Sequence, residues 1–164
     1  MTKHRLEAFS DGVIAILITL MVLKLEVPAG ANLAALRPLV PTFLAYALSF
    51  VYVAIYWNNH HHVFQAVEHV DGRVLWANLH LLFWLSLIPF LTSWMGAHPR
   101  APWPVALYGG VLLLNGVAYS LLTRALTAGA GHNPRLAAAL GRDVKGKASL
   151  VIYACSVPLA FVRP

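Results

Sequence analysis

Long apolar runs alternate with short polar breaks along this chain, and the lengths of the runs predict its fold. Five runs lie near residues 6–25, 39–57, 74–96, 103–126 and 147–162. Each is close to the roughly 20 residues with which a helix crosses about 30 Å of hydrocarbon. The pattern therefore predicts an all-α, polytopic membrane helix bundle with five spanning helices, in a single transmembrane domain that covers residues 1–164.

The residues between and within the runs predict helix ends and distortions. Proline, glycine and asparagine at positions 28–32 end the first helix, because proline cannot continue a helix and the other two tolerate turns. The second helix is expected to end in the polar residues 58–62, and residues 71–72 form a turn. Pro89 predicts a kink in the third helix. Three glycines of the fourth run predict close helix approach: Gly109, Gly110 and Gly116.

Composition places the chain in a bilayer and orients it. Hydrophobic residues make up 59% of the 164 positions and charged residues 11%, and the mean hydropathy is +0.67, whereas soluble domains are about 25% charged. The net charge of +6 is explained by the orientation of the chain in the membrane rather than by nucleic-acid binding, since more of the basic residues lie on the inner side of the membrane than on the outer side. With the N-terminus in the cytoplasm, the inner ones are Lys3, Arg5, Arg73, Arg124, Arg135, Arg142, Lys145 and Lys147, and the outer ones are Lys24, Arg37, Arg100 and Arg163.

The first predicted helix, about residues 5–26, has three distinct sides. Within roughly 60° of Arg5, at about 100° per residue, a mostly apolar stripe holds Phe9, Ile16, Thr19, Leu20 and Leu23. Beside it runs a stripe of small residues that permits close packing: Ala8, Gly12, Ala15 and Thr19. Asp11 lies about 120° from Arg5, away from the apolar stripe. The helix thus presents an apolar stripe, a stripe of small residues and an acidic side chain that is expected to point into the protein.

A carboxylate near the hydrocarbon needs partners, since its isolated burial costs at least a few kcal/mol. The candidates for Asp11 are Arg5, Trp57 and His60. Arg5 lies about 9 Å away along the helix axis at 1.5 Å per residue, so a contact within one helix is strained and one between neighbouring chains is easier. The sequence therefore favours an oligomer whose first helices meet. Helix capping by Ser10 or Asp11 is the alternative interpretation of the acid.

The start of the first helix, Arg5-Leu-Glu-Ala-Phe9-Ser10-Asp11-Gly12, resembles the arginine-x-x-x-phenylalanine-serine-aspartate signature of the transmembrane protein 175 family of potassium channels. Trp57 and His60 resemble the family's tryptophan-x-x-histidine element at the end of the second helix. Members have six spanning helices per repeat, and the resemblance covers the first five. It implies a signature and inter-helix network of Arg5, Phe9, Ser10, Asp11, Trp57 and His60.

The resemblance also implies a function. In the family, the first helices of four repeats line a central pore that is narrowest at bulky apolar side chains. Carried over, Ile16 lies five residues past the aspartate, and the further pore-facing positions are Thr19, Leu20 and Leu23. We therefore expect a potassium-selective homotetramer in a prokaryotic cytoplasmic membrane, because 164 residues hold one repeat. Potassium is the permeant ion, and no other cofactor is expected.

Other interpretations stay open at this stage. Apolar stripes such as that of Ile16 are usual on helices that face lipid or a protein core. A membrane-embedded metal enzyme would use His60, His61 and His62 joined by His80 or His69 and a carboxylate such as Glu68, because consecutive histidines point about 100° apart and cannot bind one metal by themselves. A proton-conducting channel would use Asp11 and His60. No catalytic motif supports an enzyme.

Overall fold

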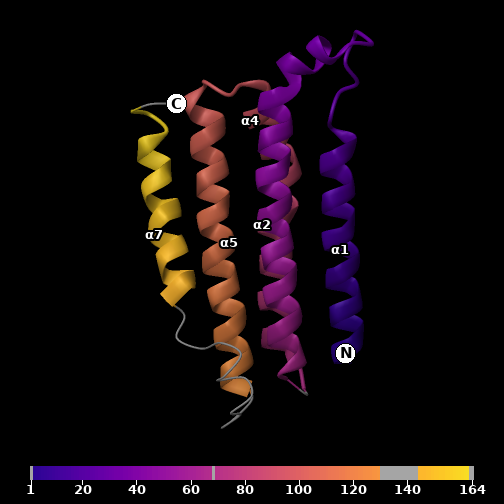
Figure 1. The fold of residues 1–164 in the computed structure, drawn as a ribbon. Helices are drawn as coiled ribbons and strands as arrows, with labels where there is room; N and C mark the ends of the chain where they lie inside the picture. The colour runs from indigo at the N-terminus through magenta and orange to yellow at the C-terminus, as the bar shows by residue number, and fades with distance from the viewer. Residues whose placement is uncertain (1, 68, 130–143, 163–164) are drawn as a thin grey trace.

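The computed structural model describes residues 2–67, 69–129 and 144–162. Its elements are α1 (Lys3–Leu23), the 3₁₀ helix η1 (Leu33–Leu39), α2 (Val40–Gln65), α3 (Gly72–Ser86), α4 (Ile88–Ala97), α5 (Pro102–Gly129) and α7 (Val144–Leu159). Figure 1 shows the long helices side by side, with α1 and α7 at opposite edges of the view. The predicted all-α bundle is confirmed, and no strand occurs in the described ranges.

Within the described residues, four segments of the bundle are long and apolar enough to cross a membrane. They are Lys3–Leu23, Leu33–Gln65, Gly72–Ala97 and Pro102–Ala128. The fifth predicted run forms α7, which has 16 residues and is shorter than the roughly 20 that a spanning helix needs. Five spans and a cytoplasmic N-terminus therefore stay predictions. The basic residues Arg135, Arg142 and Arg163 lie outside the described residues.

Proline divides the third apolar run where a kink was predicted. The helix ends at Ser86 and resumes at Ile88, so that Pro89 occupies the first turn of α4. An internal proline removes one backbone hydrogen bond and clashes with the preceding turn, whereas the first turn tolerates it. The predicted turn at residues 71–72 is instead the start of α3: Asp71 is the N-cap and accepts a hydrogen bond from the Val74 amide at 2.9 Å, and Gly72 is the first helical residue.

Three predicted boundaries differ from the structure. α1 ends at Leu23, several residues before the proline and glycine of 28–32. Residues 33–39 form η1, whose N-cap Asn32 accepts a hydrogen bond from the Ala35 amide at 3.1 Å. α2 continues through the three histidines to Gln65 rather than ending among them, because polar side chains do not interrupt the backbone hydrogen bonds of a helix.

The helices pack as one bundle around α3, α4 and α5. α1 contacts α2, α3 and α4, while α5 contacts α3, α4 and α7. Close approach of α7 explains two of the three glycines: a Cβ on Gly109 would lie 2.6 Å from Ser156 Oγ, and one on Gly116 would lie 2.6 Å from Leu150 Cδ2. The prediction is wrong for Gly110, where a Cβ would meet open space.

Candidate pore-lining helix

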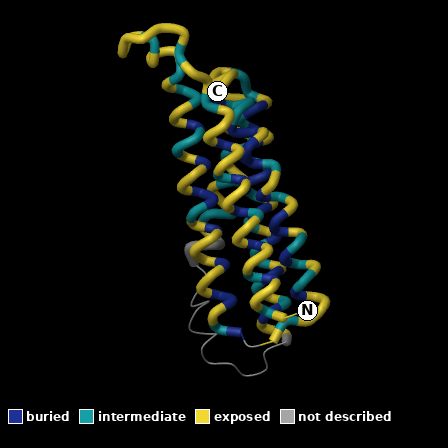
Figure 2. Tube along the Cα trace, turned by 90° about the vertical axis from the view of Figure 1, so that its right-hand side faces the viewer, coloured by how far each residue is buried: buried dark blue, intermediate teal, exposed yellow. Residues whose placement is uncertain are grey.

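α1 has one face packed against the bundle and one that its own chain leaves uncovered. The buried face consists of Leu6, Ser10, Ile14, Leu17 and Met21, spaced by three or four residues as on one side of a helix. We call Ile16, Thr19, Leu20 and Leu23, all exposed, the open face. Figure 2 views the bundle from the side of α1, and exposed positions recur along the helices that face the viewer.

The open face contains every residue that the sequence predicted to line a pore. Ile16 is 59% exposed and Leu23 72% exposed in the single chain. The Thr19 hydroxyl donates a hydrogen bond to the Ala15 carbonyl at 2.9 Å, which leaves the lone pairs of its oxygen available. Gly12 has open space where a Cβ would be. An apolar face of this length must meet either lipid or further protein.

A hydrogen bond joins α1 to α2 at the edge of the open face. Asp11 Oδ1 accepts from Trp57 Nε1 at 2.9 Å. The Trp57 ring stacks on His61, with centroids 6.0 Å apart and planes at 18°. His61 Nε2 lies 2.8 Å from the Gln65 amide nitrogen. Asp11 therefore has a neutral hydrogen-bond partner, Trp57, on α2. The Trp57 ring is in turn held in place by His61, one turn later on the same helix.

Behind the open face, three buried side chains form a network that joins three helices. Asn78 of α3 donates from Nδ2 to Ser10 Oγ of α1 at 2.9 Å, and its Oδ1 lies 2.8 Å from His60 Nε2 of α2. The Ser10 hydroxyl donates to the Leu6 carbonyl at 2.9 Å. His60 stacks on Phe64, with ring centroids 4.4 Å apart. All three polar side chains are at most 2% exposed, so the amide oxygen of Asn78 defines His60 Nε2 as the donor.

The structure therefore separates residues that the sequence grouped around Asp11. Trp57 bonds Asp11, but His60 bonds Asn78 instead. Arg5 is exposed and forms no ion pair within the described part of the chain, where Glu7 pairs with Lys3 at 3.8 Å. Phe9, also exposed, lies beside the open face. Asn78 is the only amide side chain in the third apolar run, and this is the signal in the sequence that could have pointed to it.

A second buried polar cluster, which the sequence did not predict, lies nearer the other end of the bundle. The Thr92 hydroxyl of α4 donates to Ser49 Oγ of α2 at 2.6 Å, and Ser49 lies 2.8 Å from the Tyr108 hydroxyl of α5. The Tyr52 hydroxyl donates to the Leu112 carbonyl at 3.0 Å. Nearby on α5, Asn115 is fully buried, and its Oδ1 has no hydrogen-bond partner among the described residues.

The histidine triplet does not form a metal centre in the described structure. His60 is buried, whereas His61 and His62 are exposed on other sides of α2. No group of three or more histidine, cysteine, aspartate or glutamate side chains with metal-binding geometry occurs among the described residues. Glu68, a proposed ligand, lies outside them.

Comparison with known proteins assigns the chain to a family. The family model described as "Endosomal/lysosomal potassium channel TMEM175" matches residues 5–89, which cover most of α1 and all of α2 and α3. The chain belongs to the TMEM175 family. The family resemblance read from the start of α1 is thereby confirmed.

Similar proteins occur in two bacteria and in an animal. A protein named as a potassium channel in Chryseobacterium sp. (strain P1-3) is 51% identical over 164 residues, covering 100% of this chain and 85% of that one. The crystal structure titled as a lysosomal potassium-selective channel TMEM175 homolog from Chamaesiphon minutus superposes with a TM-score of 0.81 at 29% identity, covering 98% of this chain and 87% of that chain. The endosomal/lysosomal proton channel TMEM175 of Homo sapiens is 34% identical over 114 residues, which are 62% of this chain and 23% of that protein.

Proposed function

We propose that this protein is a potassium-selective cation channel of a prokaryotic cell membrane, with a pore formed by the α1 helices of four identical chains. Membership of the TMEM175 family and the potassium-channel names of its bacterial relatives support the ion. These names also support the expectation that the protein is not an enzyme. The observation that carries the proposal is the open face of α1, which the described residues of its own chain leave exposed.

The open face requires other chains to become a pore lining. One helix contributes one side of a wall, so a closed wall needs the same face repeated around an axis, as in a symmetric homo-oligomer. Four copies would bring Ile16, Leu20 and Leu23 of each chain toward the axis. The network of Ser10, Asn78 and His60 lies on the opposite side of α1 and would hold the helix against its own protomer.

An apolar pore selects ions by radius and hydration. A regular helix has already used its carbonyl groups in its own hydrogen bonds, so the wall offers no carbonyl ring. A ring of Ile16 side chains excludes water when narrow and, when slightly wider, passes the cation that loses its hydration shell at the lowest cost. Potassium is the larger and less tightly hydrated ion, which favours it over sodium. The lone pairs of Thr19 Oγ1 offer a partly dehydrated ion one oxygen per chain.

Flux and assembly measurements test this proposal together. The purified protein should cross-link as a tetramer and pass potassium faster than sodium when liposomes are given each gradient in turn. Cysteines placed at Leu20 should cross-link between chains, whereas a cysteine at Ile152 on α7 serves as the matched exposed control. Equal fluxes of the two ions, or absence of flux from a stable tetramer, would overturn the proposal. Zinc and iron content of the same preparation would test the metal-enzyme alternative.

Proton conduction is a second candidate, favoured by the name of the human relative and by the buried His60. A proton route would require no potassium. Acidification of liposomes under a potassium-free proton gradient, compared between the unmodified protein and His60→Gln, measures it directly. Proton flux that exceeds potassium flux and falls in this variant would favour the second candidate.

A further inference from the structure

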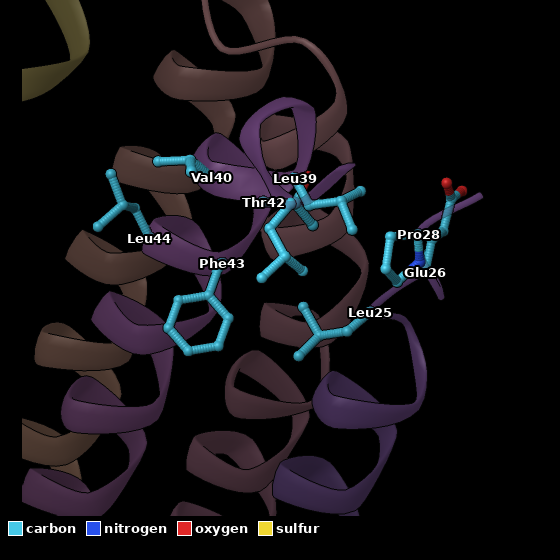
Figure 3. Close-up of a pocket in the computed structure, with 9 residues that line it drawn as sticks. Leu25, Glu26, Pro28, Leu39, Val40, Thr42, Phe43 and Leu44 are labelled. Atoms are coloured by element: carbon cyan, nitrogen blue, oxygen red, sulfur yellow. The ribbon is translucent and has the colours of Figure 1, made fainter. Parts of the chain in front are cut away.

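An apolar cavity lies between the end of α1 and the start of α2. Its volume is about 400 Å³, within the range of about 300–1,000 Å³ that small-molecule sites occupy. Leu25 follows α1, Leu36 and Leu39 belong to η1, and Val40 and Phe43 begin α2; all five line the cavity. Figure 3 shows Leu25 and Phe43 approaching each other from different segments. The lining is therefore hydrocarbon on several sides.

The cavity lies at the boundary of the proposed membrane layer. It adjoins the last residues of one candidate span and the first turn of another, at the end of the bundle opposite the N-terminus. Phe43 and Leu44, which line it, are mostly exposed and continue down α2 as a lipid-accessible surface. A hydrocarbon chain of the adjacent leaflet can thus reach the cavity along apolar surface.

Two cations are adjacent in sequence to residues that line the cavity. Lys24 precedes the lining residue Leu25, and Arg37 follows Leu36; both cations are exposed. Neither forms an ion pair within the ranges that the structure describes. Glu26 contributes one acid, and Figure 3 shows its carboxylate at the edge, turned away from Phe43. Two cations against one carboxylate favour an anionic ligand.

We propose that this cavity binds a phospholipid with an anionic headgroup, whose acyl chain enters between Leu25 and Phe43 and whose phosphate contacts Lys24 and Arg37. An amphiphile accounts for both features of the site, the hydrocarbon lining and the unpaired cations. A wholly apolar protein segment would explain the lining alone. The occupancy of this site is measured without ion flux, so the lipid proposal can be tested separately from the proposed pore.

Lipid binding to the full-length, delipidated protein tests the proposal by native mass spectrometry. Phosphatidylglycerol should bind more tightly than phosphatidylcholine with the same acyl chains. Arg37→Gln should weaken phosphatidylglycerol binding about fivefold, which corresponds to about 1 kcal/mol for one cation near an anionic lipid surface. Arg100→Gln, an exposed cation on the α4–α5 turn at the same end of the bundle, is the control and should leave binding unchanged.

Filling the cavity tests its hydrocarbon part separately. Leu36→Trp should block both lipids, whereas Leu33→Trp, one turn earlier on η1 and outside the lining, should not. Both residues are exposed, at 46% and 85%, so the variants should fold, and helical circular dichroism checks this. Equal affinity for the two lipids, an unaffected Leu36→Trp variant, or displacement of the lipid by glycerol phosphate alone would overturn the proposal.

Discussion

α1 and α7 lie at opposite edges of the bundle (Figure 1), and both leave large apolar side chains uncovered. Ile16 on α1 and Ile152 on α7 are 59% and 64% exposed. Their attachment differs. α1 is held by a buried hydrogen bond to α3, from Asn78 to Ser10, and by an exposed one to α2, from Trp57 to Asp11. The described contacts of α7 are close packing, with Leu150 against Gly116 and the Tyr153 ring 5.9 Å from that of Tyr52.

This difference shows that exposure alone does not identify a pore wall. Both helices satisfy the description of a lipid-facing surface, since lipid and a dewetted pore accept the same side chains. What distinguishes α1 is a polar network on the face opposite the uncovered one. Such a network fixes the rotation of the helix, which a wall that selects ions by radius requires.

Replacement of Ile16 by asparagine should have the largest effect. A polar ring no longer dewets, so the pore should carry larger currents with a lower potassium-to-sodium permeability ratio. Ile152→Asn changes an equally exposed isoleucine on α7 and should leave the ratio unchanged. Liposome flux, normalised to the amount of reconstituted tetramer, measures both. If the two variants behave alike, the pore does not run along α1.

Replacement of Asn78 by leucine should remove the buried hydrogen bonds that link Ser10 of α1 to Asn78 and Asn78 to His60. The change leaves His60 Nε2 buried without its acceptor, and an unsatisfied buried group costs about 1–3 kcal/mol. The melting temperature in detergent should fall accordingly. Asn115→Leu is the matched control on α5: its Oδ1 has no partner among the described residues, so its loss should be neutral or stabilising. Equal damage by both variants would assign the effect to side-chain shape rather than to hydrogen bonds.

Replacement of Asp11, whose carboxylate joins α1 to α2 through Trp57, should have a smaller effect. Asp11→Ala removes the acceptor of Trp57 Nε1, and we expect weaker tetramers, measured by light scattering after chromatography. Asp11→Asn keeps an acceptor oxygen and should preserve the assembly. A stable Asp11→Ala tetramer with altered ion affinity would instead place Asp11 in the permeation route.

The sequence predicts what depends on local chemistry and composition. Apolar run length located the four candidate spans, Pro89 located the division between α3 and α4, and helical periodicity grouped the open face. Partner choice is different, because it depends on how helices from distant segments rotate against one another. Nothing near His60 in the chain distinguishes Asn78 from Asp11 as its partner. Likewise, Asn115 Oδ1 has no partner among the described residues because of what surrounds it in three dimensions, which its neighbours in sequence do not reveal.

Thr19 gives the smallest and most specific effect, since it is the one polar side chain of the open face. Thr19→Val keeps the shape and removes the oxygen, while Thr19→Ala also removes bulk. If the lone pairs of Oγ1 assist potassium dehydration, both variants should lower the potassium-to-sodium ratio, whereas a pore that selects by radius alone should respond only to alanine. Loss of the bond to Ala15 should matter little, because an exposed helix keeps its backbone hydrogen bonds without it. Equal ratios in all three proteins would assign Thr19 to the small-residue packing edge with Gly12 and would leave selection to the Ile16 and Leu23 rings.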